Sequence, residues 1–119
     1  MPNTVTGVIA DYIQAVNAFD LDALVATFAD DAYVNDNRRE IAGSDAIRRF
    51  LAKEFIGDRL TMEVREVIDH YGATIVRARY DGDYDKTNLP DELVLTSYFS
   101  VRDGKIVSLA IIRNQPSPY

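Results

Sequence analysis

The spacing of the apolar residues changes near Gly57, and this change constrains the fold more than any other feature of the sequence. Before Gly57 they recur every three or four residues, as on one face of an α-helix. After it they alternate with polar residues, as on one face of a β-strand. The sequence therefore predicts an α+β fold with helices in the first half and a sheet in the second.

Three amphipathic helices are expected before Gly57. The first spans residues 5–19. The second follows Asp20, whose carboxylate can cap a helix N-terminus, carries Phe28 on its apolar face and is ended by Asp30 and Asp31. The third begins at Ser44, the expected N-cap residue, and ends at Gly57.

Strands are expected where apolar and polar residues alternate. The segments are 32–36, a strand starting at Leu60, 73–80, 93–101 and 106–113. In the strand after Leu60 the alternation slips near Arg65-Glu66, as a β-bulge would cause. Asp103-Gly104 predicts a two-residue hairpin loop between the last two strands.

These elements bury their apolar faces best if the antiparallel sheet curves strongly and the three helices cover its concave side. The space between the layers is then a natural internal pocket. The chain has 119 residues, of which 47% are hydrophobic and 27% charged, and this suits one folded domain over residues 1–119.

Charge and composition exclude several functions. The net charge of −6, with no stripe of Lys and Arg, argues against nucleic-acid binding. No apolar run is long enough for a membrane helix and no leader-like segment opens the sequence, so a cytoplasmic location is expected. With no cysteine and one histidine, neither a thiolate site nor a His-rich zinc site is expected. The acidic segment 81–92 imitates a calcium loop, but Lys86 stands where glycine is required, so no metal or cofactor is expected.

Tyr12 and Asp36 are polar residues on otherwise apolar faces. Tyr12 lies on the stripe of the first helix, where it can be an ordinary core residue or a hydroxyl donor. Asp36 shares a strand face with Val34, so a carboxylate is carried toward the interior, where it can serve as a general base. The alternative is a turn-forming aspartate beside Asn35 and Asn37.

Ser97 and Arg113 interrupt apolar faces in the same way. Ser97 stands in the middle of the row that includes Leu95 and Phe99, where it can line a cavity or make room for a neighbour. Arg113 follows Ile111 on the last strand, and a buried guanidinium needs an anion. That anion is Asp36, a substrate carboxylate or neither.

Residues 12–36, Gly43-Ser44-Asp45-Ala46-Ile47 and Asp103-Gly104-Lys105-Ile106-Val107 resemble the nuclear transport factor 2-like superfamily, particularly its ketosteroid isomerase and SnoaL-like members. The resemblance implies a cone-like half-barrel with an open pocket and a homodimer packed through the outer sheet face. It implies less about function, because the fold hosts isomerases, cyclases, dehydratases, epoxide hydrolases and non-catalytic modules.

The resemblance also implies roles for particular residues. Tyr12 falls where ketosteroid isomerases place the tyrosine that hydrogen-bonds the enolate oxygen, and Asp36 where they place the proton-shuttling base. Ser97 stands in place of their protonated aspartate, and Asn37 in place of the proline that commonly follows the base. Arg113, near the apolar end of the steroid cavity, suggests a smaller, more polar or anionic ligand.

The first hypothesis is therefore a small-molecule-binding, SnoaL-like isomerase or cyclase that abstracts a proton beside a carbonyl without a cofactor. Asp36 and Tyr12 are its expected catalytic residues; the expected substrate-binding residues are Ser97, Arg113, Phe99, Ile111 and Phe55. A second hypothesis is an epoxide hydrolase or dehydratase in which an Asp36–Arg113 pair activates water. A third is a non-catalytic ligand-binding or dimerisation module in which Tyr12 is core and Asp36 is salt-bridged.

Overall fold

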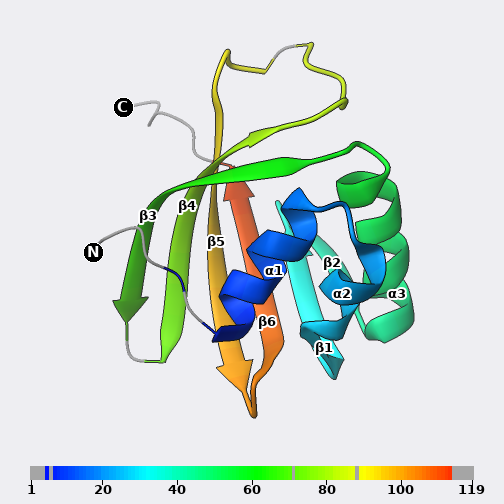
Figure 1. Ribbon diagram of the computed structural model, residues 1–119, viewed down its shortest axis with the longest axis vertical. Coiled ribbons are helices and arrows are strands. Elements are labelled where there is room, and N and C mark those ends of the chain that lie inside the picture. The colour runs from blue at the N-terminus through cyan, green and yellow to red at the C-terminus, as the bar shows by residue number, and fades with distance from the viewer. Residues whose placement is uncertain (1–4, 6, 71, 88, 114–119) are drawn as a thin grey trace.

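The apolar stripes of the first half form helices that lie on one side of the sheet (Figure 1). The computed structural model describes residues 5, 7–70, 72–87 and 89–113. The helices are α1 (Gly7–Asn17), α2 (Leu21–Ala26) and α3 (Ser44–Phe50), and α3 continues directly into a π-helical turn, η1 (Leu51–Ile56).

The N-cap of α2 is the residue predicted from the sequence, whereas the N-cap of α3 is not. Asp20 caps α2 as predicted, and its Oδ1 accepts the Ala23 N–H at 3.1 Å. The helix ends at Ala26, earlier than the predicted end at Asp30 and Asp31. The Thr27 hydroxyl donates to the Leu24 carbonyl at 2.7 Å and closes the last turn, and a strand begins at Phe28. The prediction for α3 was wrong by one residue: Gly43 is the N-cap, with φ of 87°, and no side chain caps the helix.

The second half forms most of a curved six-stranded sheet. The strands are β1 (Phe28–Asp36), β2 (Arg39–Ala42), β3 (Thr61–His70), β4 (Ala73–Asp81), β5 (Leu93–Arg102) and β6 (Lys105–Arg113), in the order β2-β1-β6-β5-β4-β3. The predicted α+β class, with helices covering a curved half-barrel sheet, is confirmed. All neighbouring strands are antiparallel except β1 and β6, which run parallel.

Local signals placed two irregularities of the sheet correctly. The register of β3 against β4 shifts between Val64 and Glu66, which is the predicted bulge. Asp103 and Gly104, with φ of 53° and 74°, form the predicted turn between β5 and β6. Strand β2 was not predicted; its turn uses Asn37 and Arg38 at φ of 48° and 78°, a sequence without the glycine typical of such turns.

The core lies between the helices and the concave face of the sheet. Tyr12 of α1 is completely buried, and its ring meets three others edge-on, with centroid distances of 6.0 Å to Phe28, 6.4 Å to Phe55 and 5.2 Å to Phe99. Val34 is also completely buried, so the inward face of β1 is the one that carries Asp36.

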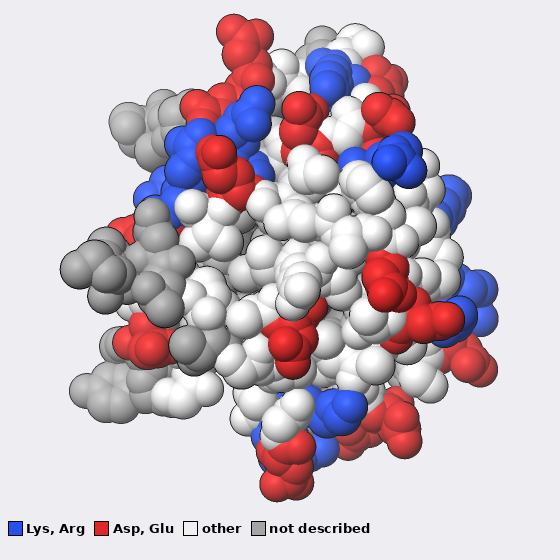
Figure 2. All heavy atoms as spheres, viewed as in Figure 1, with Lys and Arg blue, Asp and Glu red and all other residues white. Residues whose placement is uncertain are grey.

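The surface over the helices has its charges mainly around the edge, while the middle is largely uncharged (Figure 2). Within the described part of the chain, no helix has the length and apolar character needed to cross a membrane.

Candidate functional site

A cavity of about 170 Å³ opens at the end of the sheet where β1 and β6 finish. Its lining comes from six parts of the fold: Asp36 of β1, Phe50, Glu54 and Phe55 of α3 and η1, Asp58 and Leu60 before β3, Tyr80 and Tyr84 of β4 and its following loop, Leu93 and Leu95 of β5, and Ile111 of β6. Residues far apart in the sequence meet here because β1 pairs with β6, which sets Asp36 opposite Ile111.

Asp36 faces this cavity with 16% of its side chain exposed. Its Oδ2 forms an ion pair with Arg39, which stands opposite it in the β1–β2 hairpin. Arg39 also binds Glu54 through two hydrogen bonds of 2.8 and 2.6 Å. The bonds to Glu54 and to Asp36 raise the pKa of Arg39 above its usual range. Arg39 thus ties two carboxylates of the cavity together, a role that depends on the unpredicted strand β2.

Arg113 differs from Arg39 in its contacts. Among the described residues, no ion pair joins Arg113 to Asp36. The backbone N–H of Arg113 donates to the Asn37 side chain at 2.9 Å. Arg113 pairs in register with Leu95 and lies one step beyond Ile111 along the inward row of β6. Its Nε is buried and has no hydrogen-bond partner in the described segments. Arg113 therefore lies next to the cavity but is not among the described residues that line it.

The Tyr12 hydroxyl is fully buried and has no hydrogen-bond partner among the residues that the structure describes. Burial, followed by the charges of Tyr80 and Asp36, raises the pKa of Tyr12 well above its ordinary value. Tyr12 is therefore a neutral donor at physiological pH, close to two residues of the cavity. Leaving a buried hydroxyl unpaired costs about 1–3 kcal/mol, so the position is better suited to a ligand than to folding.

Tyr80 is a second buried hydroxyl at the cavity, and sequence reasoning missed it. It lies on the inward row of β4 with Val76 and Ala78, and its oxygen is 3.5 Å from that of Ser97, which is itself fully buried. The pKa of Tyr80 is raised to about 12: burial is the main cause and the charge of Asp36 adds to it, while the bond to Ser97 acts in the opposite direction. The signal that could have found it is the alternation along β4, which puts Tyr80 on the same strand face as Val76 and Ala78.

The pKa of Tyr80 leads to a prediction about alkaline stability. The folded state holds the proton of the Tyr80 hydroxyl more tightly than the unfolded state does. The resulting stabilisation of the folded state is complete below pH 10 and is lost as the pH rises from 10 toward 12. The two-unit difference corresponds to about 2–3 kcal/mol. We expect the free energy of unfolding, measured with urea from pH 9 to 12, to fall less steeply in Tyr80→Phe than in the wild type. Parallel curves would contradict the assignment.

The expected lining residues thus divide into two groups. Phe55 and Ile111 line the cavity directly. Ser97 and Phe99 are not among the described lining residues. The Ser97 hydroxyl contacts that of Tyr80, which lines the cavity, and the Phe99 ring packs against the Tyr12 ring.

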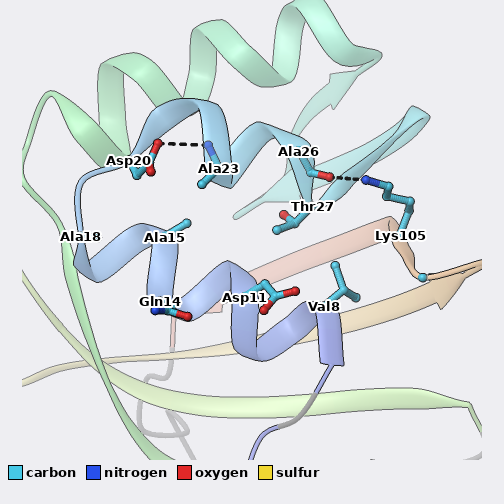
Figure 3. A pocket seen from close by; sticks show the side chains of 11 residues that line it. Val8, Asp11, Gln14, Ala15, Ala18, Asp20, Ala23, Ala26, Thr27 and Lys105 are labelled. Atoms are coloured by element: carbon cyan, nitrogen blue, oxygen red, sulfur yellow. Dashed lines mark hydrogen bonds between the residues drawn. The ribbon is translucent and has the colours of Figure 1, made fainter.

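A larger hollow of about 520 Å³ lies elsewhere, between α1, α2 and the β5–β6 turn (Figure 3). Four of its eleven lining residues are alanine, and three of its polar residues take part in the fold: Asp20 caps α2, the Thr27 hydroxyl donates to the Leu24 carbonyl, and the Lys105 Nζ donates to the Ala26 carbonyl at 2.6 Å. Neither Asp36 nor Tyr80 lines it. We therefore place the candidate chemistry in the smaller cavity.

The cavity holds no metal-binding group of the usual kind. Across residues 5, 7–70, 72–87 and 89–113, no three His, Cys, Asp or Glu side chains converge closely enough to hold an ion. What the arrangement offers is the Asp36 carboxylate and the neutral Tyr80 hydroxyl at the cavity, with the buried Tyr12 hydroxyl near both residues but outside the described lining, and these groups suit proton transfer.

Comparison with known proteins gives a family and a set of related structures. The SnoaL-like domain family matches residues 9–109. A candidate polyketide cyclase from Sinorhizobium meliloti is 30% identical, with a TM-score of 0.77 over 87% of this chain and 92% of that one.

Two further structures share the fold at lower identity. The epoxide hydrolase/cyclase-like enzyme SalBIII, described in pyran ring formation in salinomycin, is 20% identical, with a TM-score of 0.79 over 91% of this chain and 88% of its own. A protein with a ketosteroid isomerase-like fold from Catenulispora acidiphila, solved in complex with trimethylamine, is 16% identical, with a TM-score of 0.76 over 91% of this chain and 85% of its own.

Proposed function

The chain belongs to the SnoaL-like domain family, and from this premise we propose that it is a cofactor-independent isomerase or cyclase acting on a small carbonyl compound. The observation that carries the proposal is the unpaired, fully buried Tyr12 hydroxyl close to Asp36 and Tyr80. The carboxylate supplies a base and the hydroxyls supply donors for an oxyanion, which are the two groups that enolisation requires.

In the proposed reaction Asp36 removes a proton from the carbon beside the carbonyl. The C–H electron pair moves toward the carbonyl, and the resulting enolate oxygen accepts a hydrogen bond from Tyr12. Tyr80, held by Ser97, is a second donor. Protonated Asp36 then returns the proton to the same or another carbon, so the proton and the electron pair are both accounted for.

Arg39 is a positioning residue in this proposal. It engages Oδ2 of Asp36, while within the described part of the chain Oδ1 accepts one hydrogen bond, of 3.3 Å, from the Asn37 amide. Oδ1 is therefore the oxygen that is better placed to receive a substrate proton. Anchoring Arg39 to Glu54 fixes the guanidinium, and through it the direction of Asp36.

The test is deuterium incorporation from heavy water into a panel of small ketones and β,γ-enones, followed by NMR. The proposal predicts exchange beside the carbonyl above the rate of the same protein after thermal unfolding. A folded protein that exchanges none of them would favour the binding-module hypothesis, in which Tyr12 is a core residue only.

A second candidate is a hydrolase or dehydratase that activates water with an Asp–Arg pair. The observation that favours it is the contact of Asp36 with Arg39, in place of the Arg113 pair expected from sequence. SalBIII, described as epoxide hydrolase/cyclase-like, has the same fold. Diol formation from small epoxides in the same assay, without ketone exchange, would select this candidate.

We also propose that the protein is a homodimer packed through the outer face of the sheet. Ile68, Tyr98 and Ile112 are 42%, 41% and 49% exposed, which is unusual for large apolar residues. Ile68, Ile75, Tyr98 and Ala110 are register partners in turn, so they form a row across four strands.

Tyr98→Glu is expected to convert the dimer to a monomer, because it places a charge without a partner in the centre of this row. Gln14→Glu, on the exposed face of α1, adds the same charge away from the sheet and should leave the dimer intact. Sedimentation velocity gives the masses. A wild type that is already monomeric, or a Tyr98→Glu dimer, would exclude this interface.

A further inference from the structure

Apart from two tyrosines, the ionisable side chains that line the small cavity are all carboxylic acids. Asp36, Glu54 and Asp58 line it, and none of its described lining residues is Lys or Arg. Arg39 neutralises part of this charge by binding Asp36 and Glu54. Within the described residues, the Asp58 side chain forms no ion pair or hydrogen bond. The cavity therefore retains an excess of negative charge.

Asp58 is held in a fixed position. The Asp83 N–H donates to its backbone carbonyl at 2.7 Å. A side chain at Gly82 would lie 2.7 Å from the same oxygen, so glycine is needed for the β4–β5 connection to approach this closely. These contacts fix the backbone at Asp58, and its half-buried side chain stands at the cavity without a partner among the described residues.

Aromatic rings make up much of the remaining wall. Phe50, Phe55, Tyr80 and Tyr84 all line the cavity. Two of these rings already lie against cations of the protein itself: the Arg39 guanidinium is 5.6 Å from the centroid of Phe50, and the Lys86 ammonium is 5.5 Å from that of Tyr84. Carboxylates combined with aromatic faces are the groups that proteins use to bind organic cations.

We infer that this cavity selects a small carbonyl compound that carries a positively charged amine. The unpaired Tyr12 hydroxyl is outside the described lining but interacts electrostatically with Asp36 and Tyr80 of the cavity wall, and it is the donor proposed above for the carbonyl oxygen. The amine then lies toward Asp58 and the aromatic rings. The inference rests on the proposed use of this cavity as the substrate site, and it further specifies that the substrate is positively charged.

Arg113, which suggested an anionic ligand from sequence, carries less weight than these groups. It is outside the described lining, whereas three carboxylates are within it. The volume of about 170 Å³ is that of about six water-sized groups, so a ligand of few non-hydrogen atoms is favoured over a steroid.

Aminoacetone and butan-2-one are a matched pair of probes, since they differ only in an ammonium in place of a methyl group. At pH 6 the amine is protonated. We expect aminoacetone to bind at least about tenfold more tightly, measured by NMR titration of the Leu93, Leu95 and Ile111 methyl groups, with a preference that shrinks as salt is added.

Asp58→Asn is expected to weaken aminoacetone binding about tenfold and to change butan-2-one binding little. The control is Asp30→Asn, which removes the same charge from an exposed position of β1 outside the cavity and should leave both affinities unchanged. Equal affinities for the two probes in the wild type, tighter binding of butan-2-one, or no saturable shift with either would each overturn the inference. So would equal effects of the two substitutions.

Binding and exchange separate this inference from the proposed function. Selective binding of aminoacetone without deuterium exchange supports the cationic ligand and contradicts proton abstraction. Exchange of both ketones with equal efficiency supports proton abstraction and contradicts selection of a cation.

Discussion

Asp36→Asn is expected to reduce ketone deuterium exchange by about 10²–10⁴-fold, which is the range that a general base contributes. The amide has nearly the shape of the carboxylate, so the cavity keeps its volume, but it cannot accept the substrate proton at neutral pH. The rate constant for exchange, measured by NMR at saturating ketone, gives the size of the effect.

The control for Asp36→Asn is Asp31→Asn on the same strand. Asp31 is exposed and contacts Arg102 at 3.3 Å, so this change also removes a carboxylate from an ion pair. It should leave exchange at the wild-type rate. If Asp36→Asn exchanges as fast as the wild type while both variants remain folded, Asp36 is not the base and its contact with Arg39 is structural.

Tyr12→Phe is expected to have opposite effects on catalysis and on stability. Removing the donor should reduce exchange about 10²–10³-fold, as is found for single oxyanion donors. Removing an unpaired buried hydroxyl should raise the free energy of unfolding by about 1–2 kcal/mol, because the aromatic packing is kept and the desolvated polar group is lost. Urea denaturation measures the second effect.

This pair of effects separates the functional interpretation of Tyr12 from the core interpretation. A tyrosine that is core only would give greater stability without loss of activity. Tyr33→Phe is the matched control, since the Tyr33 hydroxyl is exposed and bonds Glu40 at 3.0 Å; neither activity nor stability should rise or fall appreciably. Loss of stability in Tyr12→Phe would show that the hydroxyl has a partner in solution.

The sequence identified candidate residues but not the residues that contact them in the structure. Asp36 was predicted on an inward face by its spacing from Val34, but Arg113 was the one partner considered for it, and its ion-pair partner is Arg39. Ser97 was expected to interrupt an apolar row, and it does so as the neighbour of Tyr80. In both cases the missing element was a residue on another strand.

The sequence by itself determined the features that depend on spacing and on local backbone chemistry. These are the division between helices and strands, the cap at Asp20, the bulge near Arg65 and the turn at Asp103-Gly104. Each requires only side chains within a few residues of one another, because helical and strand periodicities and turn preferences act locally.

Only the tertiary structure decided the features that depend on which strands pair and in what register. The parallel pairing of β1 with β6 brings Asp36 beside Ile111, and the short strand β2 places Arg39 over it. The unpaired state of the Tyr12 hydroxyl and the carboxylate excess of the cavity follow from these contacts. Long-range register has no local signal in the chain, since it is set by the packing of the whole sheet against its helices.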